Sequence, residues 1–113
     1  MSVWTNELIL EQAILSVIPA RAAAFEVAMR EAHAIIRTMD GYEGHELYKC
    51  IDGDCTSQYL LLIRWRRLED HTVGFRNSPQ HDEWKRLLSP FYSAPSAVKH
   101  FQEVTKGAPA KTV

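Results

Sequence analysis

The feature that most constrains the fold is an uninterrupted apolar run, Tyr59 to Ile63, within the segment "SQYLLLIRWRR" at residues 57–67. Successive side chains of a β-strand point to opposite faces of a sheet, so a strand that is apolar at consecutive positions must be covered on both faces. One layer of helices covers only one face. A chain of 113 residues has little left for another layer, and we therefore expect a homodimer in which a second copy covers the other face.

The apolar run forms the second arm of a predicted hairpin. Its first arm is the alternating segment "YEGHELYKCI" at residues 42–51, and Asp52-Gly53 follows as a possible two-residue turn. That turn would place Cys50 and Cys55 opposite each other, where a bridge could form. The N-terminus lacks the basic and apolar regions of a secretory signal. We therefore expect a cytoplasmic protein with reduced cysteines, and the C-x4-C spacing alone predicts no metal site.

The remaining elements follow from periodicity and from turn residues. Residues 8–18 predict a strand that ends at Pro19, and residues 97–105 alternate as a final strand. Residues 20–39 predict a helix that Gly41 ends in a left-handed conformation. Two helical pieces are expected at 68–77 and 78–91, and Ser78-Pro79 is a typical start for the second piece. The helix over 20–39 carries one apolar stripe, formed by Phe25, Met29, Ala32, Ile36 and Met39.

The order of these elements is strand, helix, strand, strand, helix, strand. This order predicts an α+β protein, a ferredoxin-like βαββαβ sandwich with an antiparallel sheet. The length predicts one domain, spanning residues 1–105. Residues 106–113, "KGAPAKTV", are small and polar and are expected to form a flexible tail.

The segment around Trp65 has the appearance of a basic patch, because Arg64, Arg66 and Arg67 surround the aromatic ring. A nucleic-acid surface needs an excess of positive charge to displace phosphate counterions. The chain instead has 13 basic and 14 acidic residues and a formal net charge of −1. Nucleic acid is therefore not an expected partner. A membrane is not expected either, since no apolar stretch approaches the roughly 20 residues that span a bilayer.

The segment "IRWRRLEDHTVGFRNSPQHDEWKRLLSPFY" at residues 63–92 carries a recognisable set of motifs. These are a tryptophan that ends the third strand, an acidic helix start, a Ser-Pro step and a following aromatic: Trp65, Glu69, Asp70, Ser78, Pro79 and Trp84. In these motifs the chain resembles the antibiotic biosynthesis monooxygenase (ABM)-like family of the dimeric α+β barrel superfamily. The order of elements extends the resemblance over residues 8–104.

The resemblance implies two kinds of activity. One is oxygenation of small aromatic, quinol-type substrates without metal, flavin or other cofactor, and the other is oxidative haem degradation. The haem-degrading members use an asparagine on the first strand, and Asn6 lies too early in this chain. They also use a histidine after the tryptophan that corresponds to Trp84, and none follows it in the same helix. Many members place a histidine where this chain has Phe75. Haem degradation is therefore not expected.

Three residues are candidates for catalysis: His71, His45 and Trp65. His71 lies on an apolar helical face, where it is either a packed side chain or an acid/base group in a pocket between helix and sheet. His45 could point toward the same pocket, but a slip of one residue in the strand register would reverse it. Trp65 is either a packing residue or a flat wall for an aromatic substrate.

The candidates for substrate binding are Arg64, Phe75, Arg76, His81, Trp84 and Phe91. Arg64 shares a strand face with Leu60 and Leu62, where it requires a carboxylate, an anionic ligand or the rim of the sheet. Arg76 is either solvated or within reach of a substrate oxygen. His81 is either packed in the first turn of its helix or part of the pocket.

Two hypotheses about function follow. The first is a cofactor-independent monooxygenase, in which oxygen reacts with the substrate's own anion and the protein supplies a dry pocket, a base and anion stabilisation. The second is a non-catalytic or small-ligand-binding dimer of the same fold. A cavity lined by Trp65, His71 and Trp84 would favour the first hypothesis, and tight packing of these residues would favour the second.

Overall fold

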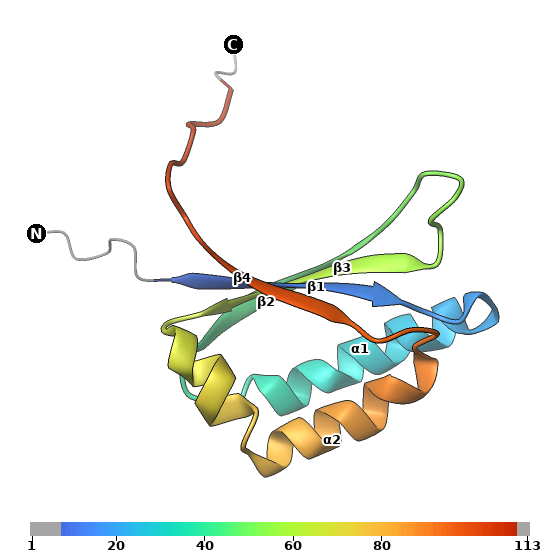
Figure 1. Cartoon of the computed structure of the whole chain (residues 1–113), viewed down its shortest axis with the longest axis horizontal. Coiled ribbons are helices and arrows are strands. Elements are labelled where there is room, and N and C mark those ends of the chain that lie inside the picture. Colours follow the sequence, from blue (N-terminus) through green and yellow to red (C-terminus); the bar gives the residue numbers. More distant parts are fainter. Residues whose placement is uncertain (1–7, 111–113) are drawn as a thin grey trace, which may run out of the picture.

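The computed structural model describes residues 8–110 and contains one four-stranded antiparallel sheet with the order β2-β3-β1-β4 (Figure 1). Its strands are β1 (Ile9–Ser16), β2 (Tyr42–Lys49), β3 (Gln58–Trp65) and β4 (Ala97–Gln102). Helices follow β1 and β3, so the structure confirms the predicted ferredoxin-like βαββαβ order. The apolar strand β3 and strand β1 occupy the centre of the sheet, and β2 and β4 form its edges.

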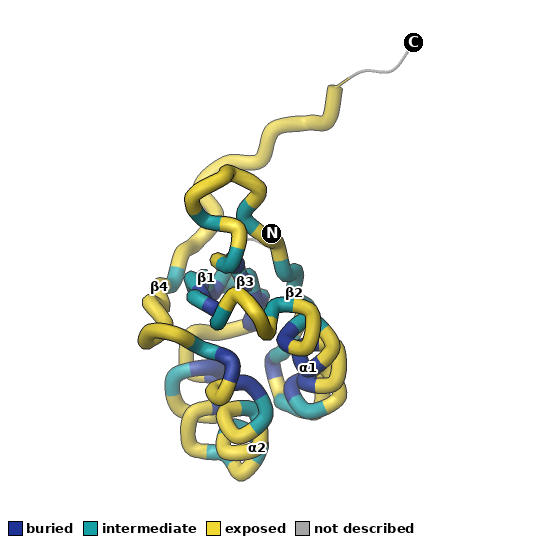
Figure 2. Tube along the Cα trace, turned by 90° about the vertical axis from the view of Figure 1, so that its right-hand side faces the viewer, coloured by how far each residue is buried: buried dark blue, intermediate teal, exposed yellow. Residues whose placement is uncertain are grey.

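The helices form one layer on one side of the sheet, as the end-on view in Figure 2 shows. Helix α1 (Ala22–Ile36) turns the predicted stripe toward the sheet, with Met39 packed at its margin. The inner face of the sheet buries alternate residues of β1 and β3, and these form the core together with Phe25 and Ile36 of α1. The buried residues of the two central strands are Glu11, Ala13, Leu15, Tyr59, Leu61, Ile63 and Trp65.

No helix lies over the outer face of the sheet (Figure 2), and this face carries apolar side chains. Three of these are well exposed, with Leu8 at 46%, Tyr48 at 54% and Phe101 at 44% of their full surface. Others alternate with the buried residues of the central strands and are half-buried: Leu10, Ile14, Leu60 and Leu62. The prediction that one helix layer leaves the second face of β3 uncovered is therefore correct for a single chain.

The connection after α1 differs from the prediction in one detail. The helix ends at Ile36 and not at Met39, and residues 37–41 form turns before β2. Gly41 has a φ of 85°, the left-handed conformation that was predicted for it. A β-carbon at Gly41 would overlap with the Asp70 carboxylate, so glycine is required there for space as well as for conformation.

The second helical region consists of three pieces. A π-helical turn, η2 (Asp70–Phe75), is followed by α2 (Pro79–Leu88) and by a short 3-10 turn, η3 (Ser89–Phe91). The Ser78 hydroxyl accepts a hydrogen bond from the backbone N–H of His81, which confirms the predicted helix start. In η2 the N–H of Arg76 donates to the carbonyl of His71, five residues earlier. The sequence predicted an ordinary helical piece here, and the wider π turn was not predicted.

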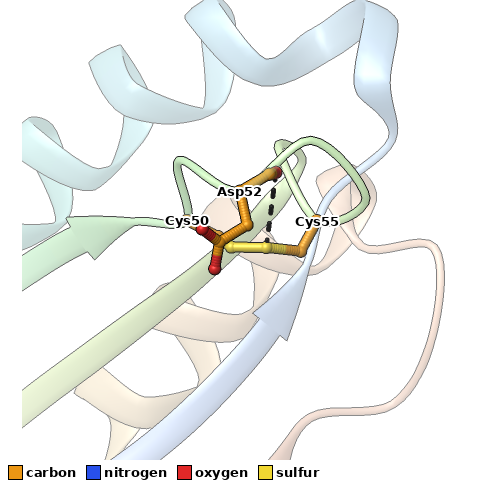
Figure 3. A group of neighbouring side chains, drawn as sticks. All are labelled: Cys50, Asp52 and Cys55. Atoms are coloured by element: carbon orange, nitrogen blue, oxygen red, sulfur yellow. Dashed lines mark hydrogen bonds between the residues drawn. A yellow bond between two sulfur atoms is a disulfide. The ribbon is translucent and has the colours of Figure 1, made fainter.

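The connection between β2 and β3 corrects the predicted two-residue turn. It spans residues 50–57 and contains two hydrogen-bonded turns, from Cys55 N–H to Asp52 O and from Gln58 N–H to Cys55 O. Cys50 and Cys55 are joined by a disulfide within this loop (Figure 3). The expectation of reduced cysteines is therefore wrong for this structure. The turns bring the two Cα atoms to 5.7 Å, within the usual span of a disulfide.

The two ends of the chain are described in part. Strand β4 ends at Gln102, earlier than the predicted residue 105, and residues 103–110 have no regular secondary structure. Asn6 and the last part of the predicted tail, residues 111–113, lie outside the described residues. Within residues 8–110, none of the helices is both long and apolar enough to cross a membrane.

Candidate functional site

A cavity of about 300 Å³ opens between the inner face of the sheet and the second helical region. This volume lies at the lower end of the range for small-molecule sites. Its floor is made by β1 and β3, and its wall by η2 and α2. The polar residues that line it include Glu11, His71, Arg76, His81, Lys85 and Tyr92, and the aromatic ones include Phe75 and Trp84.

Buried Asp70 anchors the segment that carries His71. Its carboxylate accepts a hydrogen bond from the backbone N–H of Arg67 at 3.1 Å and pairs with the Arg67 guanidinium at 3.2 Å. Gly41 leaves the space that this carboxylate occupies. The π turn begins at Asp70 and contains His71 as its second residue. The imidazole of His71 points toward the sheet, and the residue is 4% exposed. Such turns often occur at functional sites.

The carboxyl group of Glu11 forms the polar centre of the cavity floor. Glu11 is buried in the middle of the sheet, and Trp65 Nε1–H donates to its Oε1 at 2.8 Å. His71 Nε2 lies 3.4 Å from the same oxygen. The Trp65 and His71 rings stack with centroids 5.5 Å apart. A buried carboxyl group is thus held between an indole and an imidazole.

The second ring nitrogen of His71 reaches another histidine. Its Nδ1 lies 2.8 Å from Nε2 of His100 on the edge strand β4. Glu11 and His100 are register partners on adjacent strands, so their side chains share the inner face. The two nitrogens of the His71 ring therefore face His100 and Glu11, and the contact with His100 is a hydrogen bond.

The surroundings shift Glu11 and His71 toward their neutral forms. Burial raises the pKa of Glu11, while the Trp65 hydrogen bond and the charge of Arg76 oppose the rise. Burial lowers the pKa of His71, and the charges of Arg76, His100 and His81 lower it further, to about 3. Glu11 is consequently the stronger base of the two. His71 stays uncharged around neutral pH and is suited to donating or accepting a hydrogen bond.

Cationic and aromatic side chains surround the mouth of the cavity. Arg76 and Lys85 supply positive charge, and burial together with the charge of Lys85 lowers the pKa of His81. The rings of Phe75 and Trp84 meet edge to face with centroids 5.7 Å apart. The cavity therefore combines a base on its floor, aromatic walls and positive charge at its opening. This combination suits a flat aromatic molecule that becomes an anion.

The structure brings five of the predicted site residues to this cavity: His71, Phe75, Arg76, His81 and Trp84. Trp65 lies next to it without lining it, because His71 stacks over the fully buried indole. Trp65 therefore contacts the site through Glu11 and His71 and does not form a wall for a ligand.

The other predicted residues lie elsewhere, which corrects the hypothesis of one shared pocket. His45 accepts from or donates to the Tyr42 hydroxyl at 2.6 Å and lines a separate hollow between α1 and β2. Arg64 points to the outer face, where it pairs with Glu46 at 2.8 Å. Phe91 packs in the core against Phe25, with the Arg21 guanidinium over its ring.

Glu11, His100 and Tyr92 are site residues that the sequence analysis missed. The alternation of β1 contained a signal for Glu11, since it places this residue on the same face as Ala13 and Leu15. An acid in an inward-facing series is costly to bury and therefore often functional. His100 had no local signal, because its meeting with His71 depends on the register of β4.

One cluster among the described residues has the composition of a metal site. It consists of Cys50, Asp52 and Cys55 in the β2–β3 loop, whose ligand atoms lie within 4.8 Å of one another (Figure 3). The two sulfur atoms are bonded to each other in the disulfide, so within this cluster the carboxylate of Asp52 is the remaining ligand. This loop is separate from the cavity that contains Glu11.

The sequence profile of the family described as "Antibiotic biosynthesis monooxygenase" matches residues 8–87. The chain belongs to the antibiotic biosynthesis monooxygenase family. The uncharacterized protein YczJ of Bacillus subtilis (strain 168) is 45% identical over 97 residues, which cover 86% of this chain and 100% of that protein. This membership confirms the family resemblance of the 63–92 segment.

Two solved structures extend the comparison. A Bordetella bronchiseptica protein with the same family designation has a TM-score of 0.83 and 30% identity, covering 88% of this chain and 99% of that one. A Monooxygenase from Streptomyces coelicolor, in complex with the ligand Nanaomycin D, has a TM-score of 0.75 and 18% identity. The match covers 90% of this chain and 92% of that one, and at this identity it shows the fold alone.

Proposed function

We propose that this protein is a cofactor-independent monooxygenase that acts on a small aromatic, quinol-type substrate. The observation that carries the proposal is the buried carboxyl group of Glu11 on the floor of an aromatic-lined cavity of about 300 Å³. Membership of the monooxygenase family supports the reaction class. The Streptomyces coelicolor protein, a Monooxygenase with bound Nanaomycin D, supports an aromatic ligand for this fold.

In the proposed reaction, Glu11 takes a proton from an acidic CH2 group of the substrate. The resulting carbanion is delocalised over the aromatic system, and it reduces O2 and forms a C–O bond to it. Protonation gives a hydroperoxide, which loses water to leave a carbonyl group. The balance is CH2 plus O2 to C=O plus H2O, so the substrate is the reductant and no further electron donor is needed.

The roles of the cavity residues follow from their charges and positions. Glu11 is the base, because its pKa is raised, whereas the pKa of His71 lies at about 3. Arg76 and Lys85 stabilise the substrate anion at the mouth of the cavity. Phe75 and Trp84 are the aromatic walls, and His81 lies beside Phe75 with ring centroids 5.0 Å apart.

Oxygen consumption tests this function. Purified protein is mixed with a panel of anthrones and quinols in air-saturated buffer, with an oxygen electrode and chromatography of the products. We expect at least one substrate to consume one O2 per molecule converted to the carbonyl product, in the presence of a metal chelator. If no compound gives consumption above the protein-free background, the proposal is overturned.

A second candidate function is binding of a small aromatic ligand without turnover. It is favoured by the full burial of Trp65, because this residue packs in the core and does not contact a ligand. The cavity lies beside this packed core. Calorimetric titration with the same panel separates the two candidates. Binding of a compound that is recovered unchanged under oxygen supports the second function.

We further propose that the protein is a homodimer whose subunits pack through the outer faces of their sheets. This face exposes Leu8, Tyr48 and Phe101, and a contiguous apolar face of this kind is typical of an interface. A second copy is complementary to this face, because it presents the same apolar residues. The Arg64 and Glu46 side chains among them form an ion pair, so their charges neutralise each other within one subunit.

A further inference from the structure

Three side chains form a continuous line from the cavity floor to the edge of the sheet. Glu11 belongs to the central strand β1, His71 to η2 above it, and His100 to the edge strand β4. The Glu11 Oε1 to His71 Nε2 distance is 3.4 Å, and the His71 Nδ1 to His100 Nε2 distance is 2.8 Å. Glu11 and His71 are buried, whereas His100 is partly exposed. The line therefore joins a buried acid to the solvent side of β4.

The surrounding structure keeps this line in place. The Glu11–His100 register pair belongs to the β1–β4 ladder, and both side chains lie on its inner face. Trp65 holds the Glu11 carboxyl by a hydrogen bond of 2.8 Å and holds the His71 ring by stacking, with the ring planes inclined by 18°. The 3.4 Å contact is long for a hydrogen bond, as is common for catalytic contacts without substrate.

We propose that Glu11, His71 and His100 form a proton path between the cavity and the solvent at β4. The path rests on the proposed function, in which Glu11 removes a proton from the substrate. On the way out, the O–H bond of Glu11 breaks and the Nε2–H bond of His71 forms. The Nδ1–H bond of His71 breaks as the Nε2–H bond of His100 forms, and His100 releases its Nδ1 proton to water.

The proton moves through neutral imidazoles, because a charged His71 is disfavoured by its neighbours. The titratable and charged groups that face His71 are Glu11 from β1, His100 from β4, His81 from α2 and Arg76 after η2. Of these groups, Arg76 is cationic, and His81 and His100 become cationic when they are protonated. A concerted shift leaves both imidazoles neutral and exchanges their tautomers, and the proton that the peroxide later needs returns along the same line and restores them.

The test uses His100→Gln, with Lys99→Gln as the matched control at the neighbouring position, which faces the other side of β4. With a substrate identified by oxygen uptake, we expect His100→Gln to lower kcat by at least about tenfold while leaving KM unchanged. Free imidazole in the buffer should restore most of the loss, because it replaces the missing proton carrier. Lys99→Gln should keep the rate of the unmodified protein. An unchanged kcat, or a loss that imidazole does not rescue, would overturn the path.

A second readout does not depend on turnover. Nitrogen-15 NMR of the histidine side chains reports the tautomer of His71 and the exchange of its N–H proton with water. We expect His100→Gln to shift the His71 Nδ1 resonance and to slow this exchange at least tenfold, with no change in Lys99→Gln. If His71 is unaffected by His100→Gln, the path fails even when oxygenase activity is found. If the NMR result holds without oxygen uptake, the proton path stands and the proposed reaction fails.

Discussion

The indole of Trp65 lies nearly parallel to the imidazole of His71, with ring centroids 5.5 Å apart and planes inclined by 18°. The same indole donates its N–H to Glu11 at 2.8 Å. One fully buried side chain thus positions both the base and the neighbouring histidine. Trp65 ends the most apolar strand of the sheet, so the core is directly connected to the site.

Replacing Trp65 by phenylalanine removes the hydrogen bond to Glu11 and leaves a cavity. We expect Trp65→Phe to lower the free energy of unfolding by about 2 kcal/mol, measured by urea denaturation. The pKa of Glu11 should rise further, because the hydrogen bond from Trp65 lowers it. Carbon-13 NMR of the carboxyl group measures this shift. Trp84→Phe is the control, and equal Glu11 titrations in both variants would contradict the assigned role of Trp65.

His71 predicts a specific dependence of stability on pH. Its pKa is lowered from 6.5 to about 3 in the folded protein. Between these values the unfolded chain binds a proton that the folded chain does not, so stability is lost as the pH falls through this window. The slope is up to about 1.4 kcal/mol per pH unit.

The variant His71→Gln should flatten this dependence, measured as the free energy of unfolding from urea titrations at several pH values. Glu11 contributes to the pH dependence of stability with the opposite sign, because its raised pKa keeps the folded state protonated up to a higher pH than the unfolded chain. The difference between the unmodified protein and His71→Gln therefore isolates the histidine. Parallel stability curves for the two proteins would show that His71 titrates normally.

Gly41 is predicted to be intolerant of any side chain. Its φ of 85° disfavours other residues, and an added β-carbon would meet the Asp70 carboxylate. We expect Gly41→Ala to lower the free energy of unfolding by about 2 kcal/mol or more. Gly53→Ala in the β2–β3 loop, where a β-carbon meets open space, is the control and should change little. Equal stability of the two variants would mean that Asp70 is not held against Gly41.

The outer face of the sheet predicts a variant that separates the subunits. Leu62 lies on this face opposite Glu46 of β2, and Leu62→Asp places a second negative charge there. Sedimentation at micromolar concentration should give a dimer for the unmodified protein and a monomer for Leu62→Asp. Val73→Asp adds the same charge on the exposed side of η2 and should remain dimeric. A monomeric unmodified protein would refute the dimer.

Much of the fold could be predicted from sequence because it is encoded in local periodicity. The alternation of β2, the stripe on α1 and the Ser78 cap each lie within one element, and the structure confirms them. The errors in the predicted fold lie in segments where two local signals favour different structures. Asp52-Gly53 indicated a tight turn, but the paired turns and the disulfide of residues 50–57 extend the loop.

The site was less predictable because its parts come from distant elements. His71 was found, since its place between apolar residues on one helical segment is visible in the sequence. Its two polar partners are Glu11, which the register brings from β1, and His100, which the β1–β4 pairing places beside it. His45 was a candidate for the same pocket only in one strand register, and Arg64 because a buried arginine requires an anion. The structure places His45 beside Tyr42 and Arg64 beside Glu46 on the outer face.

Oxygen consumption by Glu11→Gln decides whether Glu11 is the base of the proposed reaction. Glutamine keeps an acceptor for Trp65 but cannot take a proton, so the rate with the best substrate should fall at least about 100-fold. Glu31→Gln, which changes an exposed carboxylate on helix α1, should retain the full rate. A Glu11→Gln protein that consumes oxygen as fast as the unmodified protein would show that Glu11 is not the base.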